Sequence, residues 1–318
     1  MSLRTCRAIL TCSITFKGVF IMQQEQIVLS RNGSRAVIRL MGGEIVSYRD
    51  MWGHERLHDG DPAIWNGFSP VLFPVIGFSK AGQVLIDGQR YPMPKHGLAR
   101  TSAFDAENQK ADAVDMVFKA NAQTLTHYPF DFELRVRYAL LDQGFSMTFI
   151  VTNHDKRPMP FTLGGHPAFR CPMETGERFE DYQLVFEKPE TGAQLLVNEN
   201  GLIKETAVFE PLKGQSAWTL DRAALSPIDT LILSEPMSSR VSLVQKNTGK
   251  GIALDFPGFP VLAFWTKPYA QGQYLCIEPW HGLPSWENED CEMKDRPYAI
   301  TLLPGESRQL TFTATVLD

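Results

Sequence analysis

Three segments of the sequence place one ionisable side chain among glycines, prolines and aromatic residues. His96 lies in YPMPKHGLAR, His166 in FTLGGHPAFR and Glu278 in CIEPWHGLPSWEN. Glycine and proline around a polar residue indicate a fixed, irregular backbone, and apolar neighbours shift the pKa of an ionisable group. A histidine in such surroundings can transfer protons near neutral pH, and a carboxyl group with a raised pKa can act as a general base. The three segments therefore predict acid–base chemistry.

Each of these residues also has a purely structural interpretation. His96 fits a surface loop, and His166 fits a core histidine that is hydrogen-bonded to a backbone carbonyl. Glu278 fits a carboxylate that accepts backbone hydrogen bonds. For the chemical interpretation, we expect the apolar run before Glu278 to form a strand, with the carboxyl at its end beside Trp280. Partial burial there would raise the pKa of Glu278.

The sequence predicts no metal ion and no cofactor. Glu278 and His281 have the Glu-x-x-His spacing that binds metals on a helix, but Pro279 disrupts that geometry. The patterns GxSxG, GxxxxGK[ST] and HExxH do not occur, and no GxGxxG follows a predicted strand.

Aromatic residues cluster around the same segments. Their faces stack on the C–H faces of pyranose rings while polar side chains bond the hydroxyls, so this composition favours a carbohydrate cleft. Taken singly, each tryptophan also fits a hydrophobic core. The aromatic candidates are Trp65, Phe68, Tyr91, Trp265, Trp280 and Trp286.

The elements that must position these side chains are predicted to be β-strands. Short runs of alternating or continuous apolar residues are separated by Gly, Pro, Asn and Asp, and no span of about twelve residues keeps a helical period. Residues 132–152 contain two runs joined by Asp142-Gln143-Gly144, which predicts an antiparallel hairpin. We therefore predict an all-β fold, a large twisted antiparallel β-sandwich with few short helices and a concave face. The runs cover residues 35–40, 114–119, 132–141, 145–152, 182–187, 231–233, 241–244, 252–255, 261–265, 299–303 and 309–316.

Length and composition predict one globular domain over residues 26–318. The chain has 318 residues, 43% of them hydrophobic, and no linker or repeat divides it after residue 26. Residues 1–25 are predicted to be an extension outside the fold, because Met22 offers a second start. A signal peptide is the alternative for residues 1–22, whose apolar stretch is too short to span a membrane.

The net charge and the cysteine content indicate which binding partners and which cellular compartment to expect. A net charge of -5 provides no basic excess for nucleic acid, and no membrane partner is indicated. Five cysteines without a CxxC pair suit a reducing compartment, so we predict a cytoplasmic protein. Nothing in the sequence indicates an oligomeric state.

Taken together and in order, the segments resemble the aldose 1-epimerase (galactose mutarotase-like) family, in particular its shorter, divergent bacterial members. The resemblance extends over residues 33–313, and the ordered set HG, GGHPAF and CIEPW is specific, whereas any one of them alone is weak. Its elements are GGEIVSYRD at 42–50, WNGFSPVLFPVIG at 65–77, KHGLAR at 95–100, YPFDFELRVRYAL at 128–140, VTNHDKRPMPFTLGGHPAF at 151–169 and CIEPWHG at 276–282.

The resemblance implies a cleft that interconverts the α and β anomers of a free sugar. Glu278 matches the general base, His166 the general acid, and His96 a second histidine that polarises the ring oxygen. Asp229 in SPIDTLIL matches a substrate-binding aspartate on a short motif. Further candidate substrate-binding residues are Trp265, Arg100 and Trp280.

The sequence departs from the family pattern at Phe78, where members often carry a substrate-contacting arginine. Lys80, Arg100 or Arg170 could replace that contact, or the substrate could differ. This departure affects the prediction of the substrate more than that of the reaction.

Three alternatives remain open from the sequence. A hexose-6-phosphate 1-epimerase would need two or more arginines converging on the cleft. A sugar-binding module would keep the aromatic residues and discard the proton-transfer pair. A glycoside hydrolase needs two carboxylates about 5 to 9.5 Å apart, and only Asp229 and Asp255 accompany Glu278. The partner is in each case a small-molecule sugar or a glycan.

Overall fold

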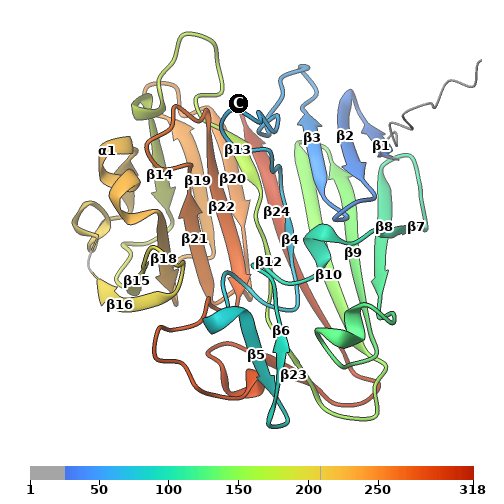
Figure 1. Ribbon diagram of the computed structural model, residues 1–318. Helices are drawn as coiled ribbons and strands as arrows, with labels where there is room; N and C mark the ends of the chain where they lie inside the picture. Colours follow the sequence, from blue (N-terminus) through green and yellow to red (C-terminus); the bar gives the residue numbers. More distant parts are fainter. Residues whose placement is uncertain (1–25, 208) are drawn as a thin grey trace, which may run out of the picture.

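The computed structural model of the chain describes residues 26–207 and 209–318 (Figure 1). Regular structure there is antiparallel β-sheet apart from short helical turns, which confirms the predicted all-β sandwich with few short helices. The helical turns are α1 (Arg222–Leu225), η1 (Lys80–Gly82), η2 (Ala99–Thr101), η3 (Thr124–Thr126), η4 (Phe179–Asp181), η5 (Glu210–Leu212), η6 (Ser226–Ile228) and η7 (Met293–Asp295).

A nine-stranded sheet forms one layer of the molecule, and it includes the predicted hairpin, whose strands pair from Gly144 opposite Leu141 to Asn153 opposite Phe132. Its strands, in spatial order, are β17 (Ala217–Thr219), β14 (Tyr182–Phe186), β19 (Arg240–Gln245), β20 (Gly251–Asp255), β24 (Ser307–Leu317), β10 (Gly144–Asn153), β9 (Phe132–Leu141), β8 (Ala113–Lys119) and β7 (Asp105–Glu107).

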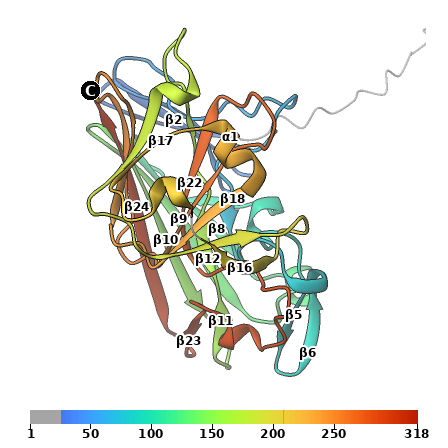
Figure 2. The same ribbon diagram turned by 90° about the vertical axis from the view of Figure 1, so that its left-hand side faces the viewer.

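An eight-stranded sheet forms the second layer, which Figure 2 shows beside the first. Its strands, in spatial order, are β16 (Ile203–Ala207), β15 (Ala193–Val197), β18 (Thr230–Ser234), β21 (Val261–Trp265), β22 (Tyr274–His281), β12 (Leu163–Gly165) and β4 (Val71–Leu72), with β13 (Ala168–Arg170) also paired to β22. Smaller sheets join β1 (Gln26–Arg31), β2 (Ser34–Arg39) and β3 (Ile45–Arg49), β5 (Gln83–Ile86) and β6 (Gln89–Pro92), and β11 (Met159–Phe161) and β23 (Ile300–Leu302).

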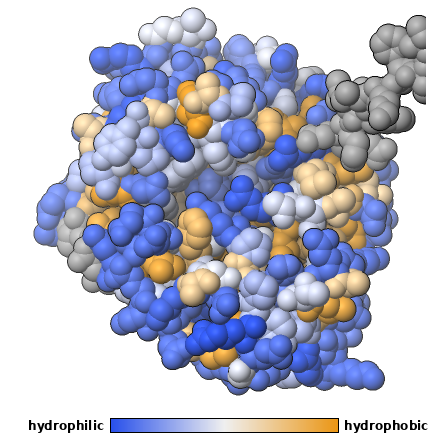
Figure 3. All heavy atoms as spheres, in the orientation of Figure 1, coloured by the Kyte–Doolittle hydropathy of each residue, from blue (hydrophilic) through white to orange (hydrophobic). Residues whose placement is uncertain are grey.

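The two faces of the eight-stranded sheet have different roles. Side chains alternate along a strand, so Leu275 and Ile277 of β22 join the main core between the layers. Cys276 and Glu278 then project from the opposite face, as does Trp265 of the neighbouring strand β21. The alternation therefore places the carboxyl group of Glu278 and the thiol of Cys276 on the outer face of this sheet. Hydrophilic residues predominate over scattered hydrophobic ones on the molecular face drawn in Figure 3.

Glu278 lies inside β22, which corrects the prediction that it ends a strand. The strand continues through Pro279 to His281, with Glu278 opposite Ala263 of β21. On its other edge β22 pairs first with β13 at Cys276 and then with β12 at Trp280. Proline lacks the N–H that a continuous ladder needs, and the ladder on this edge is interrupted between those two pairings. Pro279 is therefore compatible with the strand.

Some predictions concern residues or properties that the described residues do not reach. Residues 1–25 lie outside the described ranges, so the predicted extension, its alternative and the single-domain organisation stay predictions. Within the described ranges, Cys171, Cys276 and Cys291 are free thiols. No helix among the described residues is long and apolar enough to cross a membrane.

Candidate active site

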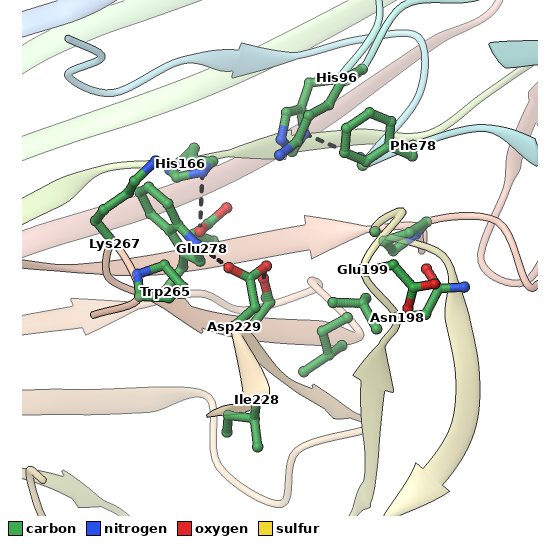
Figure 4. A pocket seen from close by; sticks show the side chains of 18 of the residues that line it. Phe78, His96, His166, Asn198, Glu199, Ile228, Asp229, Trp265, Lys267 and Glu278 are labelled. Carbon is green, nitrogen blue, oxygen red and sulfur yellow. Dashed lines mark hydrogen bonds and ion pairs between the residues drawn. The ribbon is translucent and has the colours of Figure 1, made fainter. Parts of the chain in front are cut away.

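A cavity of about 780 Å³ opens on the outer face of the eight-stranded sheet (Figure 4). Strands β15, β16, β18, β21 and β22 contribute side chains to it, and loops and helical turns from both halves of the chain contribute the rest. The seven predicted site residues that line the cavity are His96, Arg100, His166, Asp229, Trp265, Glu278 and Trp280.

Glu278 and His166 form a buried pair in this cavity. The Nε2 atom of His166 lies 3.2 Å from Oε1 of Glu278, and the two side chains are 9% and 1% exposed. Figure 4 shows the pair as neighbours from different elements, since His166 lies on the loop between β12 and β13. The core-histidine interpretation is correct about burial, but the partner of the ring is a carboxyl group rather than a backbone carbonyl.

Burial shifts the pKa values of this pair in opposite directions. It raises the pKa of Glu278 well above its usual value, against the attraction of the Lys95 ammonium. It lowers the pKa of His166 to about 3. Removal of water disfavours the charged form of both groups, so burial favours a protonated Glu278 beside a neutral His166, a pair with one shared proton and no net charge. A pair with one mobile proton is suited to accept a proton from one substrate atom and donate one to another.

Glycines allow the His166 loop to approach its neighbours. A Cβ at Gly164 would lie 2.6 Å from the Trp280 ring, and a Cβ at Gly165 would lie 2.6 Å from the Phe312 ring. Only glycine fits this passage without displacing an aromatic side chain. Trp65 completes the surroundings, with its ring centroid 5.4 Å from that of His166. The two glycines before His166 therefore let the backbone of this loop lie close against aromatic side chains.

His96 is buried and its ring accepts a backbone hydrogen bond, which excludes the surface-loop interpretation. Its φ of 62° belongs to a tight turn, which brings its Nδ1 within 3.1 Å of the Gly77 backbone N–H. Because Nδ1 accepts this hydrogen bond, the proton of the neutral ring is on Nε2. Burial lowers the pKa of His96 well below its usual value, which keeps the ring neutral. Its ring lies edge-on to that of His166, with centroids 5.6 Å apart.

Asp229 and Trp265 form a second polar pair beside the first, with the Trp265 ring centroid 5.8 Å from that of His166. The indole Nε1 of Trp265 donates to Oδ1 of Asp229 at 3.1 Å, and the Thr230 hydroxyl donates to Oδ2 at 3.2 Å. These bonds orient the carboxylate and leave acceptor positions for hydroxyl groups of a ligand. Trp280, in contrast, is 2% exposed and packs in the wall of the cavity.

Three positively charged side chains line the cavity, and one of them lies over Phe78. The Lys95 ammonium lies 4.7 Å from the Phe78 ring centre, and Arg100 and Lys267 also line the cavity. No ion pair involves the side chains of these three cations among the described residues. Burial lowers the pKa values of Lys95 and Arg100, which indicates that the cavity wall removes part of their hydration.

Two of the three residues suggested to compensate for Phe78 do not reach the cavity. The Lys80 ammonium donates to the Glu289 carbonyl at 3.0 Å, and the Arg170 guanidinium bonds the Leu57 carbonyl at 3.1 Å. Only Arg100 of the three lines the cavity.

Sequence reasoning missed Lys95 and Lys267 as cavity residues. Lys95 adjoins His96 in the motif KHG, and the positive φ of His96 is the local feature that brings the turn into the cavity. Lys267 lies two residues after Trp265, the last residue of β21, so its position just after a strand that carries a site residue was the available signal.

Comparison with known proteins gives a consistent result. A sequence profile described as Aldose 1-epimerase matches residues 25–315. Protein LacX of Lactococcus lactis subsp. lactis is 32% identical over 287 residues, which cover 88% of this chain and 95% of that protein.

Solved structures agree with this match. A galactose mutarotase-like protein from Lactobacillus casei ATCC 334 superposes with a TM-score of 0.86 at 29% identity, covering 92% of this chain and all (100%) of that chain. A galactose mutarotase related enzyme from Lactobacillus acidophilus gives a TM-score of 0.84 at 27% identity, covering 92% and 98% of the two chains. With a cavity lined by a paired carboxyl and imidazole and a profile match over nearly all described residues, this chain belongs to the aldose 1-epimerase family of sugar epimerases.

Proposed function

We propose that this protein interconverts the α and β anomers of an aldose by opening and closing the sugar ring, with Glu278 as general base and His166 as general acid. The observation that carries the proposal is the buried His166–Glu278 pair, 3.2 Å apart, at the wall of a cavity of sugar size. Family membership supports a sugar epimerase.

The proposed reaction uses the single proton of the pair. This proton first moves from Glu278 to His166, and the Glu278 carboxylate then accepts the proton of the C1 hydroxyl while His166 donates to the ring oxygen. The C1–O5 bond breaks and an aldehyde forms, which rotates about C1–C2. The proton transfers then run in reverse, and the ring closes as the other anomer. General acid and base catalysis each contribute typically about 10²- to 10⁴-fold.

Other cavity residues have supporting roles in this proposal. The neutral His96 ring offers its Nε2–H to a substrate oxygen, because the Gly77 N–H occupies Nδ1. Asp229, oriented by Trp265, accepts hydrogen bonds from sugar hydroxyls. The Trp65 and Trp265 rings, with centroids 5.1 Å apart, provide an apolar wall for the C–H face of the sugar.

Polarimetry of freshly dissolved α-D-glucose and α-D-galactose tests the reaction. We expect the wild-type protein to accelerate the change in rotation and Glu278→Gln to lose at least about 100-fold of that rate, the lower bound for removing a general base. Asp255→Asn, at a half-buried carboxylate paired with Arg240, is the matched control and should keep the wild-type rate. Equal rates for wild type and Glu278→Gln would refute the assignment of the base.

A phosphorylated aldose is a second candidate substrate, and the cavity cations favour it. Lys95, Arg100 and Lys267 form no close ion pair in the described ranges, and an anionic group in the cavity could pair with them. A plant protein from Cenchrus ciliaris, named as a candidate glucose-6-phosphate 1-epimerase, is 24% identical over 315 residues, 89% of this chain and 82% of that protein.

The two substrate classes are distinguished by comparing kcat/KM for glucose and glucose 6-phosphate in wild type and Arg100→Met. A preference for the phosphate that falls at least about tenfold in Arg100→Met would support the second candidate, since a charge-assisted bond contributes roughly 1.5–3 kcal/mol. A preference for the free sugar, unaffected by Arg100→Met, would exclude it. A cytoplasmic location stays a prediction from the cysteine content.

A further inference from the structure

Cys276 lies in contact range of the catalytic pair and has no part in the proposed reaction. It precedes Glu278 by two residues on β22, so both side chains project from the same face of the sheet. Its Sγ, a ring nitrogen of His166 and a carboxyl oxygen of Glu278 all lie within 4.8 Å of one another. One thiol, one imidazole and one carboxyl group thus converge at a single point.

Two buried polar atoms of this cluster make no hydrogen bond of standard geometry among the described residues. They are Nδ1 of His166 and Oε2 of Glu278, and the contacts of the His166 ring with its own backbone and of the Glu278 carboxyl with Trp280 fall short of that geometry. Buried polar atoms without partners are costly, so unpaired atoms beside a thiol indicate an incompletely satisfied site. Sulfur, imidazole nitrogen and carboxylate oxygen are the donor types that zinc binds. Zinc bonds of about 2.0 to 2.3 Å need donor atoms about 3 to 4 Å apart, which small side-chain rotations would achieve.

An ion has a route to this cluster. His166 and Glu278 line the cavity, whereas the Cys276 thiol lies beneath it, packed with Trp65 and Trp265. A hydrated cation in the cavity would first contact the imidazole of His166 and the carboxyl group of Glu278. The Cys276 thiol, which lies deeper, would then be its third protein ligand.

We propose that Cys276, His166 and Glu278 form an inhibitory binding site for a soft divalent cation of the zinc class. Binding releases two protons to solvent, one from the thiol and one from the His166–Glu278 pair, and replaces the hydrogen bond of the pair with bonds from the metal to sulfur, nitrogen and oxygen. Water holds the remaining coordination position. Neither catalytic group can then exchange a proton with a sugar. The ion is an inhibitor here and takes no part in turnover, and this effect on turnover rests on the proposed function.

Direct binding is tested on the full chain with Cd²⁺, whose thiolate complexes absorb in the ultraviolet. We expect Cys276→Ala to lose one equivalent of the thiolate-to-cadmium absorbance of the wild type. The matched control is Cys291→Ala, which removes a partly exposed thiol outside the cavity. Should Cys276→Ala fold poorly by circular dichroism, Cys276→Ser serves as the second variant. Equal site-specific absorbance in wild type and the Cys276 variant would overturn the proposal.

Inhibition is tested by following anomer interconversion at increasing Zn²⁺, with each variant normalised to its own metal-free rate. We expect the half-inhibitory concentration to rise at least about tenfold in Cys276→Ala and to stay at the wild-type value in Cys291→Ala. EDTA should restore the rate, and Mg²⁺, which prefers oxygen ligands, should not inhibit. Equal inhibition of wild type and Cys276→Ala would contradict the site. A wild type without epimerase activity would refute the proposed function, while the cadmium absorbance would still decide the binding site.

Discussion

The proton shared by His166 and Glu278 determines how activity should depend on pH. Burial lowers the pKa of His166 to about 3 and raises that of Glu278 well above 4.5, so the pair keeps one proton over a wide range. Catalysis needs that one proton, because a doubly protonated pair has no base and a fully deprotonated pair has no acid. The activity should therefore form a broad plateau rather than a narrow peak.

We predict that kcat/KM stays level down through the pH range in which an ordinary histidine titrates, near its usual pKa of 6.5. The rate should fall on the alkaline side, as the pair loses its last proton at the raised pKa of Glu278. A pH–rate profile with a non-ionising sugar measures both limbs. An acidic limb centred near 6.5 would mean that His166 titrates as an exposed imidazole.

Glu278 should also be a source of instability at high pH. Its pKa is raised in the folded protein, so the folded state binds more protons than the unfolded state between the unfolded and the folded pKa. The free energy of unfolding therefore decreases as pH rises through that window. Glutamine carries no charge at any pH, so Glu278→Gln should gain stability relative to wild type as pH rises.

Urea unfolding of wild type and Glu278→Gln at about pH 5 and about pH 8 checks this prediction. The stability difference should favour the variant more at the higher pH. A difference that is independent of pH would show that Glu278 is ionised in the folded protein.

At the scale of elements, the turn that carries His96 depends on the residue after it. Gly97 has a φ of 75°, and a Cβ there would clash with the carbonyl oxygen of Phe73. Gly88, in the turn between β5 and β6, has a similar φ of 77° but open space around it. Both glycines have a left-handed backbone conformation, but only a Cβ at Gly97 would clash with a neighbouring atom.

We predict that Gly97→Ala lowers both stability and turnover, while Gly88→Ala lowers stability alone. The left-handed conformation costs an alanine about 1–2 kcal/mol at either position. At Gly97 the clash adds to that cost and displaces the His96 ring. Thermal unfolding and kcat, measured on both variants, separate the two effects. Equal kcat losses in the two variants would contradict the importance of this turn.

Much of the element level could be predicted from the sequence, because strands and hairpins are encoded locally. The alternation in residues 132–152 and the Gly-containing turn between its runs correspond to β9 and β10. The interior position of Glu278 could not be predicted, since Pro279 normally ends a central strand. Its place in β22 depends on a gap between two partner strands, β12 and β13, which is a tertiary feature.

The catalytic candidates could be named from motifs, but their contacts could not. The sequence motifs mark His96, His166 and Glu278 as chemical residues, and only the folded chain shows that His166 and Glu278 lie 3.2 Å apart. Lys95 and Lys267 were missed because flexible cations on loops carry no periodic signal, and their approach to the cavity depends on the turns beside them.

At the scale of the whole molecule, one core joins segments from both ends of the chain. The main apolar cluster contains Leu29 of β1 and Val316 of β24, together with Ile277 of the site strand. A shared core favours cooperative unfolding. We predict a single urea transition, with coincident midpoints by tryptophan fluorescence and by far-ultraviolet circular dichroism. Two separated transitions would contradict the single-domain prediction for residues 26–318.

The central claim is that Glu278 and His166 work as one proton-transfer pair. Polarimetry of a fresh α-anomer with wild type, Glu278→Gln, His166→Gln and the double variant tests it most directly. Residues that act as a unit are non-additive, so we predict that each single variant loses about as much rate as the double variant. Losses that multiply in the double variant, or a His166→Gln variant with the wild-type rate, would contradict the account.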